Sequence, residues 1–328
     1  MEDYSFKKKN ALQKALLKLT NKTAYRQYKR DLAEYKLLLV RQNQVSKVKK
    51  FLDTTGSFDL NKILTLTEGK RPLIVSHSGN AGDIIYAMPT LKRIHELTGI
   101  PLHVFFRIDQ PLVLPYYFRH PLGSVMLNRK MADMLLPLIQ TQPYVENAGI
   151  YTHEKIHLDL DNFRRCGISL DQGDIARWCS YIAGVNPELH KPWLFVKPNP
   201  AFTNKVIIAR SERYRNPLID YSFLNEYDNL IFVGTPSEFQ DLKKTIAKIE
   251  FVTVENFLQL ASMIASCKLF IGNQSFPFAV AEGLKVPRLL ELCLYQPNVM
   301  PAGPNGNDFF FQNHFESLVA MYLSTDSR

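Results

Sequence analysis

An acidic residue follows a glycine-rich loop in the stretch SHSGNAGD, residues 76–83. Gly79 and Gly82 allow a ligand to approach the backbone closely, and Asp83 opens a helix that we expect from about residue 83 to residue 97. On one interpretation, Asp83 only stabilises the positive end of this helix, by about 0.3–1 kcal/mol. On the other, its carboxylate takes a proton from an acceptor hydroxyl. Local spacing alone favours the first interpretation.

The same loop lacks the spacing of two common nucleotide-binding motifs. It contains neither GxGxxG nor a GK[ST] ending, so we expect neither a dinucleotide fingerprint nor a P-loop. Asn80 and Gly82 remain candidates for contacts with a bound substrate. We expect no metal site, because a strand would hold His153 and His157, the best candidate ligands, about 13 Å apart at ~3.3 Å per residue.

Arginine and hydroxyl side chains gather at the end of another expected strand, residues 204–211. Guanidinium groups pair bidentately with phosphate oxygens, so such a cluster is suited to a diphosphate. The alternative is a solvated loop in which an acid neutralises an arginine, and this stretch alone favours that alternative. The candidate donor-binding residues here are Arg210, Ser211, Arg213 and Tyr214.

A third polar group ends the strand that we expect in IGNQSFPFAVAEGLKVP, residues 271–287. Asn273, Gln274 and Ser275 stand at the strand end, and a proline then begins a helix. Backbone N–H groups and short polar side chains are therefore available to a phosphate or a ribose. Glu282 on this helix either accepts hydrogen bonds from sugar hydroxyls or is simply exposed.

Short apolar strands alternate with helices in two series. A strand, glycine loop, helix and second strand follow Arg71, and a similar series begins at residue 204. In the second series Gly234 forms a turn after a strand and is a further candidate donor-binding residue, and we expect Ser237 to cap the next helix. The pattern predicts an α/β protein with two Rossmann-like halves that face a ligand cleft. The expected segments are a basic amphipathic helical segment (1–55), a connector (56–70), two domains (71–195 and 204–300) joined by a proline-rich linker (191–200), and a C-terminal helical segment (308–328).

The net charge of +9 belongs to the N-terminal segment. Residues 1–50 carry 14 Lys and Arg against 4 Asp and Glu, a net charge of +10. A repeat of Tyr and Leu from Tyr25 to Leu39, at spacings of 3 and 4, puts an apolar stripe on one face of a helix. This basic helix either lies on an anionic membrane surface or packs its stripe on the body or on a second copy. We expect no nucleic-acid binding, because no recognition motif is present.

The remaining composition is that of an ordinary globular protein. Hydrophobic residues make up 46% of the 328 residues and charged residues 22%. The four cysteines are widely spaced, which is typical of reduced thiols. No window has the ~20 apolar residues of a membrane-spanning helix, and the first residues do not have the pattern of a secretory signal.

Taken together, three stretches resemble the heptosyltransferase-like glycosyltransferases, glycosyltransferase family nine, over about residues 71–292. SGNAGDIIYAMPTLKRI is similar to the family's GD-x(5)-P-x-L motif, with Gly82, Asp83, Pro89 and Leu91 in place. LIFVGTPSE is similar to the family's strand, glycine turn and acid. FLQLASMIASCKLFIGNQSFPFAVAEGLKVP is similar to its most characteristic block, which typically ends IGNDSGPxHLAAALGxP.

This resemblance implies a GT-B fold and an inverting, metal-independent transfer from a nucleotide-activated sugar, with no further cofactor. It places the general base at Asp83 and the donor diphosphate near Arg210, Ser211, Arg213 and the loop 272–275. The implied partners are the nucleotide sugar and a glycan or lipid-linked acceptor of surface-glycan synthesis. The implied location is the cytoplasm, at the inner face of the membrane.

Three positions depart from the family pattern and keep alternatives open. Gln274 stands where Asp is usual, Phe276 where Gly is usual, and Ala279 where His is usual. The chain is therefore either an active glycosyltransferase or a GT-B module that holds a nucleotide sugar without turning it over. A polysaccharide pyruvyltransferase is a third possibility, because that group also carries an N-x-G-D loop like the one from Asn80 to Asp83.

Overall fold

The computed structural model describes residues 6–56, 58–112 and 123–323. The contacts divide the chain into two units, one of residues 1–56 with 165–168 and one of residues 57–164 with 169–328. Residues 1–5 of the expected N-terminal segment and 324–328 of the expected C-terminal segment lie outside the described residues.

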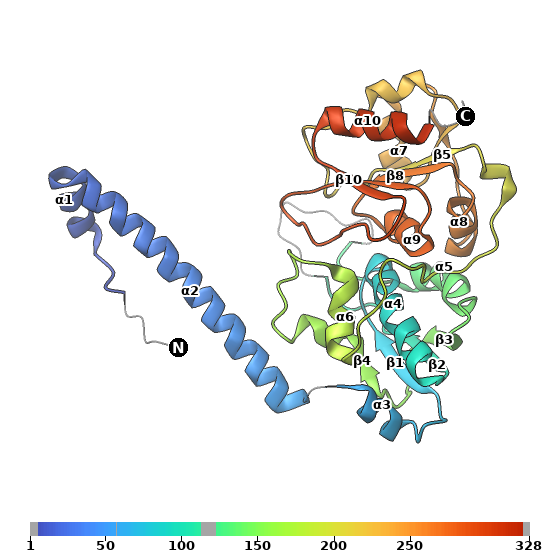
Figure 1. Ribbon diagram of the computed structural model, residues 1–328, viewed down its shortest axis with the longest axis horizontal. Coiled ribbons are helices and arrows are strands. Elements are labelled where there is room, and N and C mark those ends of the chain that lie inside the picture. Colours follow the sequence, from blue (N-terminus) through green and yellow to red (C-terminus); the bar gives the residue numbers. More distant parts are fainter. Residues whose placement is uncertain (1–5, 57, 113–122, 324–328) are drawn as a thin grey trace. The chain divides into compact units, whose positions relative to one another are not determined.

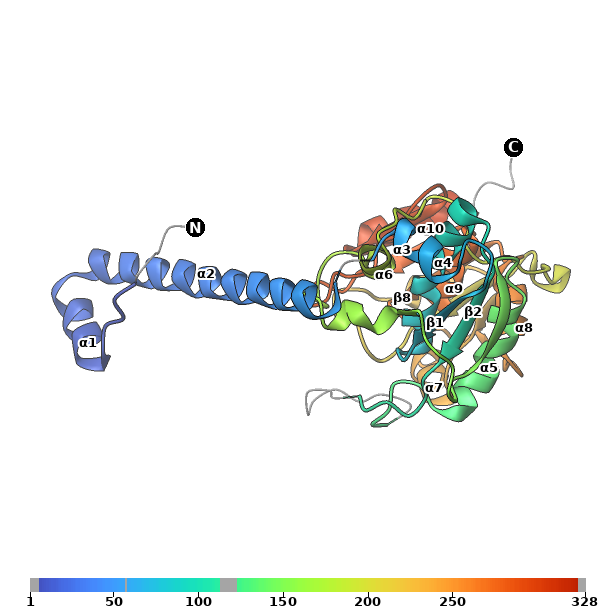
Figure 2. The same ribbon diagram turned by 90° about the horizontal axis from the view of Figure 1, so that it is seen from below.

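The first unit consists mainly of two helices, α1 (Ala11–Thr20) and α2 (Lys22–Thr55). The chain reverses between them, so that α1 lies beside the beginning of α2 (Figures 1 and 2). Asn21 ends α1 and also caps α2, because its side chain accepts a hydrogen bond from the N–H of Ala24 at 2.9 Å. The capping amide explains why one residue is enough to separate the two helices.

The second unit begins with a four-stranded parallel sheet in the order β3-β2-β1-β4. Its strands are rich in buried apolar residues, as expected of a sheet covered by helices. The elements of this half are α3 (Leu60–Leu66), β1 (Leu73–His77), α4 (Ala81–Thr98), β2 (Leu102–Phe106), α5 (Arg129–Gln140), β3 (Val145–Ile150), β4 (Leu158–Asp159), η1 (Leu160–Arg164) and α6 (Ile175–Ala183).

A six-stranded parallel sheet follows, in the order β10-β9-β8-β5-β6-β7. Its core contains the fully buried rings of Tyr221, Phe232 and Phe315. The elements of this half are η2 (Pro200–Phe202), β5 (Val206–Ala209), η3 (Ser222–Glu226), β6 (Leu230–Phe232), α7 (Pro236–Lys243), β7 (Glu250–Phe251), α8 (Phe257–Ile264), β8 (Leu269–Asn273), α9 (Phe276–Leu284), β9 (Arg288–Glu291), β10 (Gly306–Phe309) and α10 (Gln312–Leu323).

Helices from the two halves pack directly on one another. α4 of the first half contacts α9 of the second, and α5 contacts α8, between the two sheets (Figure 1). The N-termini of α4 and α9 each follow the carboxyl end of a central strand, β1 and β8 respectively. This packing brings the two loops that carry candidate site residues to the same interface.

Several expected boundaries are wrong for local reasons. The connector at 56–70 contains α3, whose Ile63 is completely buried. The helix after β6 is capped by Thr235, not by Ser237, because Thr235 and Glu238 form a reciprocal capping box around Pro236. The strand near His153 and His157 is also shorter than the spacing argument assumed: β4 has only two residues, and the chain then turns into the 3-10 helix η1.

The proline-rich segment 191–200 is packed rather than extended freely between domains. The N–H groups of Trp193 and Leu194 both donate to the carbonyl of Gly283 in α9, at 2.9 and 3.1 Å. A Cβ at Gly283 would lie 2.8 Å from the Leu194 side chain, so the glycine permits this close approach. The segment is therefore attached to α9 through Gly283.

Candidate active site at the interface of the two halves

Asp83 lies at the third position of α4 and is partly accessible, with 23% of its side chain exposed. Its Oδ2 accepts hydrogen bonds from the backbone N–H of Asn80 at 3.3 Å and from Nη2 of Arg164 at 2.9 Å. Both interactions use the same oxygen, and no described residue donates to Oδ1. Asp83 thus stabilises its helix and at the same time keeps one carboxylate oxygen for a ligand.

A charged network of the first half holds Asp83 in place. Arg164, at the end of η1, bridges Asp83 and Asp161 and lies over the ring of Phe163 at 4.3 Å. Asp161 in turn accepts a hydrogen bond from the N–H of Ser78 at 3.1 Å. Three elements, α4, η1 and the loop after β1, are therefore tied together at the carboxylate of Asp83.

His77, the last residue of β1, lies beneath this network and is buried. Its Nδ1 accepts a hydrogen bond from the N–H of Gly79 at 2.8 Å and lies 3.7 Å from Asp161. Burial lowers the pKa of His77, against the opposing charge of Asp161. The imidazole is therefore neutral at pH 7, which suits its role as an acceptor for the loop.

Asp161 carries the negative charge that this arrangement needs. Burial alone would raise its pKa, but His77, Arg164 and the hydrogen bonds from Ser78 outweigh it and lower the pKa below the ordinary value. Asp161 is consequently ionised at pH 7 and paired with Arg164.

Gly79 is the residue that makes room for the network. A Cβ on Gly79 would lie 2.6 Å from Nη2 of Arg164 and 2.6 Å from Cε1 of His77. These distances are shorter than any ordinary contact, so a side chain here would displace Arg164 or the imidazole. The glycine therefore serves the Asp83–Arg164 ion pair rather than a turn conformation.

In the second half, Asn273 at the end of β8 anchors the loop after β5. Its side chain is completely buried; Oδ1 accepts from the N–H of Ser211 at 2.9 Å, and Nδ2 donates to the carbonyls of Ser211 and Arg213 at 2.9 and 2.7 Å. The Ser211 hydroxyl also donates to the carbonyl of Arg213 at 3.0 Å. Ser211 and Asn273, both expected to contact a donor, thus shape the loop from within.

The two candidate arginines of this loop have different roles. Arg210 forms a bidentate ion pair with the completely buried Glu291, at 2.7 and 2.8 Å, and lies over the ring of Tyr221 at 4.4 Å. Arg213 lies over the ring of its neighbour Tyr214 at 5.2 Å and forms no ion pair with a described residue. Arg210 is therefore committed to the core, and Arg213 is the cation with a guanidinium available to a phosphate.

Tyr214, next to Arg213 in the loop after β5, is affected by the charge of Asp83 in the first half. Its backbone is in the left-handed region, with φ of 61°, which a tyrosine adopts only under constraint. Burial raises the pKa of its hydroxyl; Arg213 opposes this shift, and the negative charge of Asp83 adds to it. Asp83 and Tyr214, 131 positions apart in the sequence, are therefore close enough in the fold to interact electrostatically.

The N-termini of α4 and α9 approach one another closely. A Cβ on Gly82 would lie 3.8 Å from the Cα of Phe276, which is the first residue of α9. The Phe276 ring stacks in a tilted arrangement on Phe257, with 4.1 Å between ring centroids. The positive ends of the two helix dipoles therefore converge near Asp83.

The residues just before α4 and α9 also carry buried polar atoms that lack a hydrogen-bond partner. Asn80 Oδ1, Gln274 Oε1 and Ser275 Oγ have no hydrogen-bond partner among the described residues. The amide nitrogen of Gln274 donates to the carbonyl of Gln296 and to Oδ1 of Asn298, both at 2.7 Å. A ligand with hydroxyl groups at this point would satisfy the unpaired oxygens, each of which costs about 1–3 kcal/mol while unpaired.

Two residues that we predicted to contact a substrate stabilise the fold of the second half. The expectation that Glu282 contacts a sugar is wrong, because its carboxylate is 1% exposed and paired with Lys285 and Arg288. Gly234 forms the turn before α7, where a Cβ would lie 2.8 Å from the Phe232 ring. Neither residue presents a group to the interface around Asp83.

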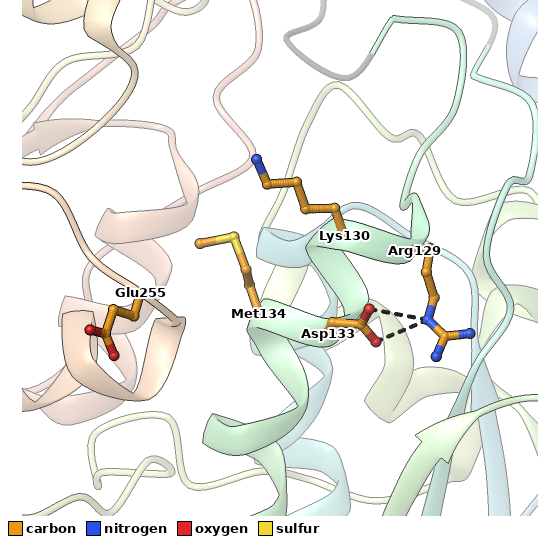
Figure 3. Close-up of a pocket in the computed structure, with 5 residues that line it drawn as sticks. All are labelled: Arg129, Lys130, Asp133, Met134 and Glu255. Atoms are coloured by element: carbon orange, nitrogen blue, oxygen red, sulfur yellow. Dashed lines mark hydrogen bonds and ion pairs between the residues drawn. The ribbon is translucent and has the colours of Figure 1, made fainter.

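A cavity of about 530 Å³ lies elsewhere along the interface (Figure 3). Lys130 and Met134 of α5 point toward the segment that carries Glu255, while Arg129 and Asp133 pair with each other at 3.0 Å. None of the predicted site residues lines this cavity. Its mixture of cationic and anionic groups suits a polar ligand, and sequence reasoning did not single out any of its residues.

Comparison with solved structures settles the fold. The E. coli heptosyltransferase WaaC, determined with ADP, aligns with a TM-score of 0.52 and 10% identity over 76% of this chain and 99% of its own. A family 9 glycosyltransferase of Veillonella parvula aligns with a TM-score of 0.49 and 11% identity over 76% and 88%. No protein-family model and no curated protein sequence matches the chain.

The chain has a GT-B fold. The two Rossmann-like halves that the alternation of strands and helices predicts are present as two parallel sheets, and the fold implied by the family resemblance is confirmed. The helices α1 and α2 are the extra N-terminal helical part. Among the described residues, no helix is both long and apolar enough to cross a bilayer.

Arg164, Asp161 and His77 are the members of the site that sequence reasoning missed. The available signal was the run DLDNFRR, in which two acids precede two arginines directly after a strand. That run does not indicate which acid pairs with which arginine. The pairing of Arg164 with Asp83 spans 81 positions and becomes visible only in the fold.

Proposed function

We propose that this protein transfers a sugar from a nucleotide diphosphate sugar to a hydroxyl group of an acceptor, with Asp83 as the general base. The observation that carries the proposal is the position of Asp83 in a GT-B fold. A partly exposed carboxylate lies at the converging N-termini of α4 and α9, beside the loop of Arg213 and Tyr214.

In this mechanism Oδ1 of Asp83 accepts the proton of the acceptor hydroxyl, whose oxygen attacks the anomeric carbon of the donor. The bond from that carbon to the diphosphate oxygen breaks on the opposite face, so the configuration is inverted. Arg164 holds Oδ2 and fixes the orientation of the carboxylate. Positioning and charge stabilisation then supply the catalytic effect.

The leaving diphosphate needs positive charge, and the second half supplies it in two forms. Arg213 contributes a guanidinium without an ion pair among the described residues, and the N-terminus of α9 contributes backbone N–H groups and a helix dipole. We propose that these groups compensate the diphosphate without a metal ion. Because the WaaC structure contains ADP, ADP-sugars are the first donors to test.

The proposed acceptor is a glycan or lipid-linked hydroxyl of surface-glycan synthesis such as lipopolysaccharide, and the proposed location is the cytoplasm. The cavity at Lys130 and Glu255 offers polar groups to a large acceptor. Hydroxyl groups of such a substrate are also suitable partners for the unpaired oxygens of Asn80 and Ser275.

A non-catalytic nucleotide-sugar-binding module is the second candidate. One observation favours it: Arg210 forms an ion pair with Glu291, so of the two candidate arginines only Arg213 remains for the diphosphate. Such a module would bind a nucleotide sugar and leave it intact.

Donor binding and turnover separate the two candidates. We expect ADP or an ADP-sugar to raise the melting temperature of the wild type, and to raise it less in Arg213→Ala. Asp83→Asn should keep the donor-induced shift and lose at least 100-fold in transfer, because the general base is removed. The matched control is Asp59→Asn, since Asp59 caps α3 away from the interface. Donor binding without transfer by the wild type, across a panel of glycan acceptors, would support the binding module.

A further inference from the structure

The helix α1 exposes an apolar stripe that no described residue of its own unit covers. Leu12, Leu16 and Leu19 are 82%, 63% and 83% exposed. Their spacings of 4 and 3 residues place them on one face of the helix. Such exposure of three large apolar side chains on one short helix is characteristic of an interaction surface.

The helix is formed by local interactions at both ends. Asn10 caps its first turn, accepting from the N–H of Gln13 at 2.9 Å while the Gln13 side chain accepts from the N–H of Asn10 at 3.1 Å. The N–H of Asn21 closes the last turn on the carbonyl of Leu17 at 2.9 Å. The leucine stripe is therefore held in helical register without support from a partner.

The segment before α1 folds back along α2 and uses other apolar groups. The Phe6 ring stacks on Tyr28 and Tyr35, with centroid distances of 5.6 and 5.2 Å. The N–H of Lys9 donates to the hydroxyl of Tyr28 at 3.0 Å. This arrangement covers part of the Tyr and Leu stripe expected on α2, and it leaves the leucines of α1 on the outside.

The charge of the residues in and around α1 indicates what kind of surface this helix binds. Residues 6–30 contain nine Lys and Arg and no Asp or Glu. Lys14 and Lys18 belong to α1 itself, at angular positions away from the leucines, and the others flank it on both sides. An amphipathic helix with exposed leucines and uncompensated cations matches an anionic lipid surface, where apolar side chains enter the acyl boundary and cations meet the headgroups.

We propose that α1 docks the protein onto a membrane that contains anionic lipids. Leu12, Leu16 and Leu19 enter the bilayer boundary, and the lysines from Lys7 to Lys18 contact the headgroups. The ten residues of α1 extend about 15 Å at 1.5 Å per residue, so the helix lies in the interface and does not cross the bilayer. The proposal does not depend on the activity proposed above.

The test is co-sedimentation of the full-length protein with vesicles of phosphatidylcholine alone or with one-quarter phosphatidylglycerol. We expect at least tenfold tighter binding to the anionic vesicles, weakened by 0.5 M salt because the cations are screened. Replacement of Leu12, Leu16 and Leu19 by Ser should weaken that binding at least tenfold. The control replaces Leu97, Leu218 and Leu294, which are 45%, 60% and 56% exposed in the other unit, by Ser.

A second variant, with Lys7, Lys8 and Lys9 replaced by Gln, tests charge without touching the leucines and should lower binding several-fold. Equal binding to both vesicle types, or binding to neither, would overturn the proposal. It would also be overturned by a leucine variant that binds vesicles normally but changes from oligomer to monomer in light scattering, since α1 would then be a contact between copies of the chain.

Discussion

Arg164 is the residue whose replacement tests the site network most directly. In Arg164→Ala, Asp83 and Asp161 lose the guanidinium that bridges them. Loss of one partner of a buried pair costs about 3–5 kcal/mol, and loss of an exposed pair at most about 1 kcal/mol. Arg164 is 20% exposed and Asp161 10%, so the site lies between these limits. We expect the free energy of unfolding to fall by about 2–3 kcal/mol at pH 7.

This loss should depend on pH in a defined direction. In the wild type the pKa of Asp161 is lowered, so its contribution to stability is present above the unfolded pKa of 3.8 and disappears as pH falls through the folded pKa. Without Arg164, one of the groups that lower this pKa is missing, while the burial that raises it remains. The difference between wild type and variant should therefore persist down to about the unfolded pKa of 3.8 and shrink as pH falls further, toward the folded pKa.

The assay is urea unfolding followed by tryptophan fluorescence at pH 7 and at about pH 3, below the unfolded pKa of Asp161. Trp178 is a suitable reporter, because its ring lies 5.5 Å from Phe163 and Phe163 lies beneath Arg164. Arg129→Ala is the control, since its ion pair with Asp133 is exposed and should contribute less than about 1 kcal/mol. An Arg164→Ala loss that is equal at both pH values, or no larger than that of the control, would refute the network.

Two further predictions concern single residues. Gly79→Ala should destabilise the protein by about 1–3 kcal/mol and abolish transfer, as measured by urea unfolding and donor turnover, because its Cβ would lie 2.6 Å from Arg164 and His77; a stable, active variant would contradict this role. Burial lowers the pKa of Lys285 to about 8, and the negative charge of Glu282 opposes this shift. Below pH 8 the buried charge of Lys285 therefore lowers the stability of the protein. This cost is relieved as pH rises from 8 toward the unfolded pKa of 10.5. The unfolding free energy of the wild type should rise relative to Lys285→Met between pH 8 and 10, and a constant difference would show that Lys285 does not titrate there.

The fold was predictable because buried parallel strands are apolar runs that alternate with amphipathic helices. β1, β5 and β8 each follow this pattern, and each is followed by the polar loop expected at a carboxyl end. Asp83 could be predicted as a site residue because its motif is local. Arg164 was not, because an ion pair across 81 positions depends on how η1 turns back under α4. Glu282 was misplaced for the same reason, since its partner Arg288 lies on the next strand and draws the carboxylate into the core.

The same long-range pairing bears on the proposed donor site. Arg210 and Arg213 look equivalent in the sequence, but Glu291 is completely buried and depends on Arg210 for its charge compensation. Moving Arg210 onto a phosphate would leave that carboxylate unpaired, at a cost of about 3–5 kcal/mol. Arg213 is 60 residues from Asn273 in sequence, yet its carbonyl accepts a hydrogen bond from the Asn273 side chain while its guanidinium lies over the ring of Tyr214. A fixed backbone that carries a guanidinium without an ion pair to a described residue is suited to a diphosphate, so donor affinity in this chain should depend on Arg213 far more than on Arg210.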